Sequence, residues 1–201
     1  MRDEPGVARI GSLANLLGIA RILATPVVIA LILIGSPGLG IVAFVLFALA
    51  AATDFLDGWV ARARGEVSPL GVFMDLTADK VLVSGVLVAM VEVGLLPTWI
   101  VATILIRELV IAGVRQMAAA ESVVIPARAL GKAKTLTTLV GMAVLLLAYD
   151  AATGGPMADT GIGPGAEVAG FWLMVVATAL TVVSGWDYLR GSMPMLRGER
   201  G

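Results

Sequence analysis

The chain has 201 residues, of which 59% are hydrophobic and 14% are charged, and its mean hydropathy is +0.98. This composition excludes an ordinary soluble domain and predicts an integral membrane protein. Cysteine and histidine are both missing from the sequence, which excludes disulfides, thiol catalysis, imidazole metal ligands and Ser-His-Asp chemistry. Any acid–base work therefore falls to carboxylates, lysines or tyrosines.

Six segments of the chain are apolar enough to be membrane spans. A helix that crosses a hydrocarbon core about 30 Å thick needs roughly 20 mostly apolar residues. The segments cover residues 15–34, 40–60, 70–95, 99–117, 135–149 and 168–189. Glycines and prolines flank several of them, around residues 35–37, at residue 97 and between residues 154 and 165. We therefore predict an all-α integral membrane protein with six transmembrane helices.

Three parts of the chain follow from these spans: an N-terminal cytoplasmic or interfacial segment (residues 1–14), a six-helix transmembrane domain (residues 15–189) and a cytoplasmic tail (residues 190–201). Residues 7–17 mix Arg9 with apolar side chains, so this stretch either lies along the headgroups as an interfacial helix or forms a disordered tail. Arg21 interrupts the first apolar run, and the length of that run suits a full span better than a cleaved signal peptide.

Basic residues are distributed unevenly along the chain. They gather at the N-terminus, in or near the connections after the second and fourth spans, and at the C-terminus, whereas the loops around residues 36, 95 and 150–167 have none. An even number of spans puts all the basic segments on one side, and the positive-inside rule makes that side cytoplasmic. We expect a multi-pass protein of the cell membrane whose termini and active site both face the cytoplasm.

Acidic residues are scarce, yet four aspartates lie at the end of the second span and the start of the third: Asp54, Asp57, Asp75 and Asp79. At about 100° per helical residue, the first two lie roughly 60° apart and the last two roughly 40° apart, so each helix offers a pair of oxygen ligands. Carboxylates at membrane level are costly unless they are paired. A divalent cation relieves their repulsion, and hard oxygen donors favour magnesium, calcium or manganese over zinc or copper. Ion pairs with Arg62 and Lys80 are the alternative.

The segment DFLDGWVAR, followed after eight residues by GVFMDLTAD, is similar to the signature of the CDP-alcohol phosphatidyltransferase family, DxxDGxxAR and then GxxxDxxxD. The resemblance implies a six-helix membrane enzyme, usually a homodimer, that moves a phosphatidyl group from a CDP-linked lipid to an alcohol and releases CMP. It implies metal ligation by Asp54, Asp57 and Asp75, and a general-base role for Asp79, which is also a candidate ligand. The cofactor expected is Mg²⁺ or Mn²⁺, with two ions per site.

Residues expected to contact the CDP-lipid are Asn15, Arg21, Gly58, Ala61, Arg62 and Gly71. Small residues let a flat pyrimidine approach the backbone, but they equally suit helix packing in lipid. The guanidinium of Arg62 suits phosphate, and interfacial anchoring is its alternative. A helix cap and a snorkelling side chain are the alternatives for Asn15 and Arg21.

A second basic group consists of Arg107, Arg115, Lys132 and Lys134 and suits the phosphate of an anionic acceptor. Positive-inside topology charge is the alternative, which fits Arg107 least because it lies furthest within an apolar run. The segments NLLGIARIL, ADKVLV, RELVIAGVR and GKAKT resemble the phosphatidylglycerophosphate synthase branch of the family, whose acceptor is glycerol 3-phosphate. Leu76 and Thr138 depart from that branch, where proline and glutamine are usual.

The resemblance to this branch implies transfer of the phosphatidyl group from CDP-diacylglycerol to glycerol 3-phosphate, giving phosphatidylglycerophosphate and CMP. A sister enzyme acting on inositol phosphate, inositol, serine or phosphatidylglycerol stays open. A cation transporter would explain the aspartates but not the basic group, and a purely structural membrane subunit would explain neither. The expected partners are membrane lipids and a second copy of the chain, with no nucleic acid.

Overall fold

The computed structural model describes the backbone of residues 13–64, 69–120 and 129–196, and the side chains of residues 16–53, 77–120 and 130–195. In these ranges the fold is all-α, as predicted. The long helices are α1 (Leu13–Ile34), α2 (Leu39–Arg64), α3 (Pro69–Glu92), α4 (Thr98–Ala120), α5 (Ala129–Ala152) and α6 (Gly163–Leu196). A short 3-10 helix, η1 (Ala158–Thr160), lies between α5 and α6.

Each long helix contains most or all of one predicted span. The ends differ most for α5 and α6. Helix α5 begins at Ala129 rather than at residue 135, because its first turns carry lysines that a search for apolar residues leaves out. Helix α6 begins at Gly163 with Pro164 in its first turn, where a missing N–H has no helical partner to lose, and it continues past the predicted end to Leu196.

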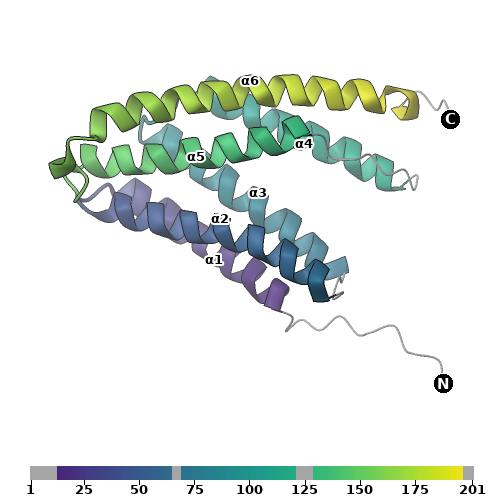
Figure 1. Cartoon of the computed structure of the whole chain (residues 1–201), viewed down its shortest axis with the longest axis horizontal. Helices are drawn as coiled ribbons and strands as arrows, with labels where there is room; N and C mark the ends of the chain where they lie inside the picture. Colours follow the sequence, from purple (N-terminus) through teal and green to yellow (C-terminus); the bar gives the residue numbers. More distant parts are fainter. Residues whose placement is uncertain (1–12, 65–68, 121–128, 197–201) are drawn as a thin grey trace.

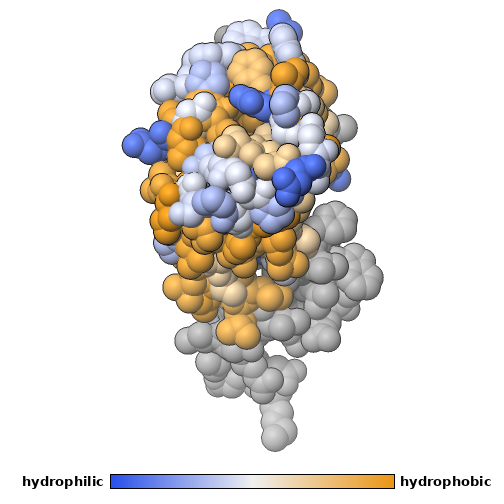
Figure 2. All heavy atoms as spheres, turned by 90° about the vertical axis from the view of Figure 1, so that its left-hand side faces the viewer, coloured by the Kyte–Doolittle hydropathy of each residue, from blue (hydrophilic) through white to orange (hydrophobic). Residues whose placement is uncertain are grey.

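Three helical segments in the described part of the chain are long and apolar enough to cross a membrane: Leu16–Ile34, Leu130–Ala152 and Gly163–Met195. By this measure the first, fifth and sixth spans are confirmed, and the other three stay predictions. Figure 2 views the end of the molecule at the α1–α2 and α5–α6 connections, where hydrophilic residues gather, while hydrophobic residues cover the sides. This distribution fits a protein surrounded by lipid along its length.

The helices form two packing groups. Helix α1 packs on α2 and α3, helix α6 packs on α4 and α5, and the main contact between the groups is α2 against α5. In Figure 1, α2 ends and α3 begins at the same end of the bundle, where α1 begins and α4 and α6 end. The signature aspartates are therefore carried towards the end of the bundle that also holds both basic connections.

Small residues set the closeness of these contacts. A Cβ at Gly85 of α3 would lie 2.9 Å from Ile29 of α1, and one at Gly170 of α6 would lie 2.7 Å from Leu145 of α5. Helices in lipid associate by such close packing, because lipid tails give no hydrophobic driving force for association. The α1–α3 and α5–α6 pairs thus approach each other at glycines.

At the end of the bundle opposite the basic connections, Asp150 joins the two groups. Its side chain is completely buried. Its Oδ1 accepts the backbone N–H of Ile41 at 2.9 Å, and its Oδ2 accepts that of Met157 at 3.0 Å. One carboxylate therefore satisfies a donor at the start of α2 and another in the α5–α6 connection.

A second contact fixes the same end of the bundle. Tyr149 donates its hydroxyl to the carbonyl of Ile32 in the last turn of α1 at 2.9 Å. Gly35 follows with φ +62°, a conformation that glycine adopts readily, and a Cβ there would lie 2.7 Å from the Tyr149 hydroxyl. The chain can therefore turn out of α1 beneath the tyrosine.

Candidate active site

A pocket opens where α3 faces α4 and α5. Helix α3 contributes Asp79, Lys80, Val83 and Ser84, helix α4 contributes Ile104, Leu105 and Glu108, and helix α5 contributes Lys134, Thr135, Thr138 and Leu139. The lining therefore combines two acids, two cations and apolar side chains. An apolar pocket with a few converging charged groups is the usual form of a small-molecule site.

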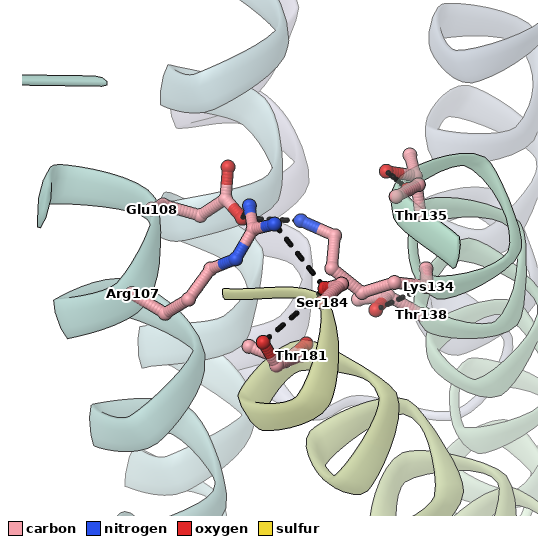
Figure 3. Close-up of polar contacts among 8 residues, drawn as sticks. Arg107, Glu108, Lys134, Thr135, Thr138, Thr181 and Ser184 are labelled. Carbon is pink, nitrogen blue, oxygen red and sulfur yellow. Dashed lines mark hydrogen bonds and ion pairs between the residues drawn. The ribbon is translucent and has the colours of Figure 1, made fainter. Parts of the chain in front are cut away.

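Glu108 and Lys134 form the ionic centre of this pocket. The Lys134 ammonium donates to Oε1 of Glu108, and Figure 3 shows the lysine reaching across from α5 to α4. Nη1 of Arg107 donates to the same Oε1 at 2.9 Å. The Lys134 side chain is 9% exposed and that of Glu108 is 28% exposed. A carboxylate shared by two cations leaves a net positive charge in this group.

Asp79 and Lys134 line the same pocket. The candidate base and a candidate acceptor cation therefore belong to one site, although 54 positions separate them in the sequence. Helices α3 and α5 meet across this pocket, which α4 also lines.

Helix geometry explains why Lys134 points into the pocket. Thr138 lies one turn after Lys134 on the same face of α5, and its hydroxyl donates to the Lys134 carbonyl at 2.9 Å. Both side chains line the pocket. Thr138 is one of the two positions that depart from the phosphatidylglycerophosphate synthase pattern, so this departure lies in the wall beside the candidate cation. Leu76, the other departure, lies outside the described side chains.

The backbone of α2 carries Asp54 and Asp57 and that of α3 carries Asp75 and Asp79, so each predicted pair does lie within one helix. The side chains of the first three aspartates are outside the described residues. Among the side chains that the structure does describe, no cluster of three acidic residues could hold a metal. The carboxylate of Asp79 lines the pocket and supplies the oxygen donors that magnesium prefers. In donor chemistry the aspartates therefore fit a divalent cation, whereas their mutual geometry stays a prediction.

Among the predicted CDP-lipid residues, Asn15 lies in α1, Gly58, Ala61 and Arg62 lie in α2 and Gly71 lies in α3, all beyond the described side chains. The Arg21 side chain is described, and it is 2% exposed within the bundle. Burial of this degree does not fit a side chain that snorkels to the membrane surface.

The four predicted acceptor cations occupy different positions. Lys134 lines the pocket, and Arg107 lies behind it, joined through Glu108. Lys132 and Arg115 are exposed and are not among the described residues that line the pocket. The Arg115 guanidinium lies 5.5 Å from the centre of the Tyr188 ring on α6. The structure therefore brings two of the four together around one carboxylate.

Sequence reasoning missed the contribution of α6. Nη2 of Arg107 donates to the Ser184 hydroxyl at 3.2 Å, and this hydroxyl donates to the carbonyl of Thr181 at 3.3 Å. Figure 3 shows both contacts beneath the arginine. Ser184 occurs in a segment that reads as generically hydrophobic, and a single serine there gives no signal of its partner. Glu108 gives a clearer signal in the sequence than Ser184 does, because an acid within an apolar run requires a counter-ion.

The fold and the pocket define a multi-pass membrane protein in which ionised residues from three helices converge inside an apolar bundle. Residues 11–183 match the model of the CDP-alcohol phosphatidyltransferase family, and the chain belongs to this family. It is therefore a phosphatidyltransferase. This family membership excludes the two alternative hypotheses, a cation transporter and a purely structural membrane subunit.

Several bacterial proteins are similar to this chain over most of its length. A protein from Mycobacterium tuberculosis named "Probable phosphatidylglycerophosphate synthase" is 34% identical over 198 residues, which cover 97% of this chain and 88% of the relative. Two further relatives are named "CDP-diacylglycerol--glycerol-3-phosphate 3-phosphatidyltransferase". The protein from Bacillus subtilis is 35% identical, and the match covers 76% of this chain and 74% of the relative. The protein from Cereibacter sphaeroides is 31% identical, and the match covers 94% of this chain and 99% of the relative.

Proposed function

We propose that this enzyme transfers the phosphatidyl group of CDP-diacylglycerol to glycerol 3-phosphate and releases CMP. The single observation that carries the proposal is the pocket that Asp79 of the family signature and Lys134 both line. A base beside a cation is the arrangement needed for an acceptor that carries both a hydroxyl and a phosphate. Relatives that cover 97% and 94% of this chain have names that support the same acceptor.

In the proposed reaction, Asp79 accepts the proton of the primary hydroxyl of glycerol 3-phosphate. The hydroxyl oxygen forms a bond to the lipid-side phosphorus of the pyrophosphate, and the bond from that phosphorus to the bridging oxygen breaks. The electron pair stays on the bridging oxygen, which leaves with CMP. Lys134 binds the acceptor phosphate and so holds the hydroxyl near the base.

Asp54, Asp57, Asp75 and Asp79 would hold the divalent cations, Mg²⁺ or Mn²⁺, and we propose two per site. When bound, the cations would neutralise the pyrophosphate oxygens and lower the pKa of the attacking hydroxyl. Asn15, Arg21, Gly58, Ala61, Arg62 and Gly71 are the proposed contacts of the CDP-lipid. Arg107, Arg115 and Lys132 would supply further positive potential for the acceptor.

We also propose that the pocket opens to the cytoplasm and that the enzyme is a homodimer. The basic connections support the orientation through the positive-inside rule, since they lie at the end of the bundle that carries the signature. Cytoplasmic access would let a charged, water-soluble acceptor enter without crossing the membrane.

The proposal is tested by measuring CMP release from CDP-diacylglycerol by the purified protein. Glycerol 3-phosphate should support release, which a chelator should abolish and added Mg²⁺ or Mn²⁺ should restore. Inositol phosphate, inositol, serine and phosphatidylglycerol should each be poorer acceptors. Faster CMP release with any of these four would mean that this alcohol, and not glycerol 3-phosphate, is the acceptor. CMP release that persists in chelator would refute the proposed role of the metals.

A further inference from the structure

Three helices are connected by a chain of polar contacts that ends at the pocket. It runs from the Ser184 hydroxyl on α6 to Arg107 on α4, from Arg107 to the Glu108 carboxylate, and from that carboxylate to the Lys134 ammonium on α5. Ser184 is 6% exposed and the Arg107 side chain 15% exposed, so water competes weakly for these contacts. Hydrogen bonds shielded in this way fix side-chain geometry more firmly than exposed ones do.

Gly185 gives Arg107 its path across α6. A Cβ at Gly185 would lie 3.0 Å from Cγ of Arg107 and 3.4 Å from its Nε. The first of these separations is tighter than ordinary van der Waals contact, so any larger residue would push the arginine stem away from α6. Both ends of the guanidinium are already engaged, by Glu108 and by Ser184, and the stem has little freedom to give way.

The Nε of Arg107 supports the same conclusion. It is buried and has no hydrogen-bond partner among the described residues. A buried donor without a partner carries a free-energy cost. The contacts at the two terminal nitrogens must offset it, so this arginine is held where it lies by Glu108 and Ser184 rather than by satisfaction of all its donors.

We propose that Ser184 and Gly185 are positioning residues for the Lys134 ammonium, acting through Arg107 and Glu108. Gly185 provides the space for the arginine stem, and Ser184 orients its guanidinium. Arg107 then holds the Glu108 carboxylate at the place where Lys134 binds it. Helix α6 thereby sets the affinity of the pocket for the phosphate of the acceptor without touching the acceptor itself. This inference rests on the proposed function, in which Lys134 binds that phosphate.

The test compares Gly185→Ala and Ser184→Ala with wild type, measuring CMP release while the concentration of each substrate is varied. Both substitutions should raise KM for glycerol 3-phosphate by about fivefold, the equivalent of one ordinary hydrogen bond. The value of kcat and the KM for CDP-diacylglycerol should stay near wild type. Ser184→Thr keeps the hydroxyl and should recover most of the acceptor affinity.

Gly165→Ala is the matched control, because it makes the same substitution in α6 at a glycine with nothing within 4 Å of a Cβ. It should leave both KM values unchanged. In an Arg107→Ala background, Gly185→Ala should have no further effect, since residues that act through one shared partner are not additive. Thermal unfolding of each variant identifies any loss of activity that is caused by misfolding. If Gly185→Ala misfolds, the comparison of Ser184→Ala with Ser184→Thr still tests the inference.

An unchanged KM for glycerol 3-phosphate in both variants would overturn the inference, as would equal effects on the two substrates or full additivity with Arg107→Ala. Wild-type turnover with glycerol 3-phosphate separates the two proposals. Normal turnover with unaffected variants removes only the role of α6, whereas no wild-type turnover with this acceptor removes the proposed function and this inference together.

Discussion

Replacing Lys134 by methionine tests the cation that we place on the acceptor phosphate. Methionine has nearly the same length and is apolar, so it fills the space of a side chain that is 9% exposed. Glu108 keeps Arg107 as its partner at 2.9 Å, so the substitution does not leave a buried acid unpaired. The helical bundle should therefore fold, and the effect should be confined to the pocket.

The magnitude follows from the charges that line the pocket. Asp79 and Glu108 balance Lys80 and Lys134, so removing one lysine leaves a net negative lining that repels a phosphate. A hydrogen bond to a charged group contributes about 1.5–3 kcal/mol, which corresponds to a rise of about 10- to 150-fold in KM for glycerol 3-phosphate. The KM for CDP-diacylglycerol should change little, because the residues proposed to contact that substrate lie on α1, α2 and α3.

Initial rates of CMP release at varied concentrations of each substrate measure both constants. Arg190→Met, which removes an exposed cation from α6, controls for loss of positive charge and should match wild type. Lys134→Arg should retain part of the acceptor affinity. If Lys134→Met keeps the wild-type KM for glycerol 3-phosphate, or raises only the KM for the CDP-lipid, the placement of the acceptor phosphate at Lys134 is wrong.

Three other substitutions test separate parts of the structure. Asp79→Asn should abolish CMP release because an amide cannot accept the hydroxyl proton, and wild-type turnover by the purified variant would remove its role as base. Arg115→Ala should chiefly raise KM for the acceptor; an unchanged KM would leave this arginine only its contact with Tyr188. Asp150→Asn should lower the free energy of unfolding by about 1.5–3 kcal/mol, since the new NH₂ group faces a backbone donor. Chemical or thermal unfolding in detergent measures this loss, and equal stability of the variant would contradict a stabilising role for the Asp150 contacts with Ile41 and Met157.

The sequence was sufficient for the all-α class, for the approximate position of every long helix and for the family. Long apolar runs and a fixed spacing of aspartates are local patterns, and a single chain reveals them directly. The predicted start of α5 was wrong because Lys132 and Lys134 interrupt the apolar run, although the helix continues through them. Hydropathy indicates whether a residue lies in lipid or in water, and a helix can continue from one environment into the other.

The composition of the pocket was harder to predict. Arg107 and Lys134 were both identified as acceptor candidates, but their connection through Glu108 depends on how α4 faces α5. The contact of Arg107 with Ser184 depends in addition on where α6 crosses α4. Such pairings are set by tertiary packing and leave no trace in the spacing of residues along one chain.

In the proposed reaction, the two packing groups of helices would have different roles. The family signature lies on α2 and α3, whereas Glu108 and Lys134, which line the proposed acceptor pocket beside Asp79, come from α4 and α5, with α6 behind them. A descendant could therefore exchange one alcohol for another by altering the second group alone, leaving the cleavage apparatus untouched. Diversification of headgroup chemistry from a single ancestral scaffold is a natural outcome of such a layout.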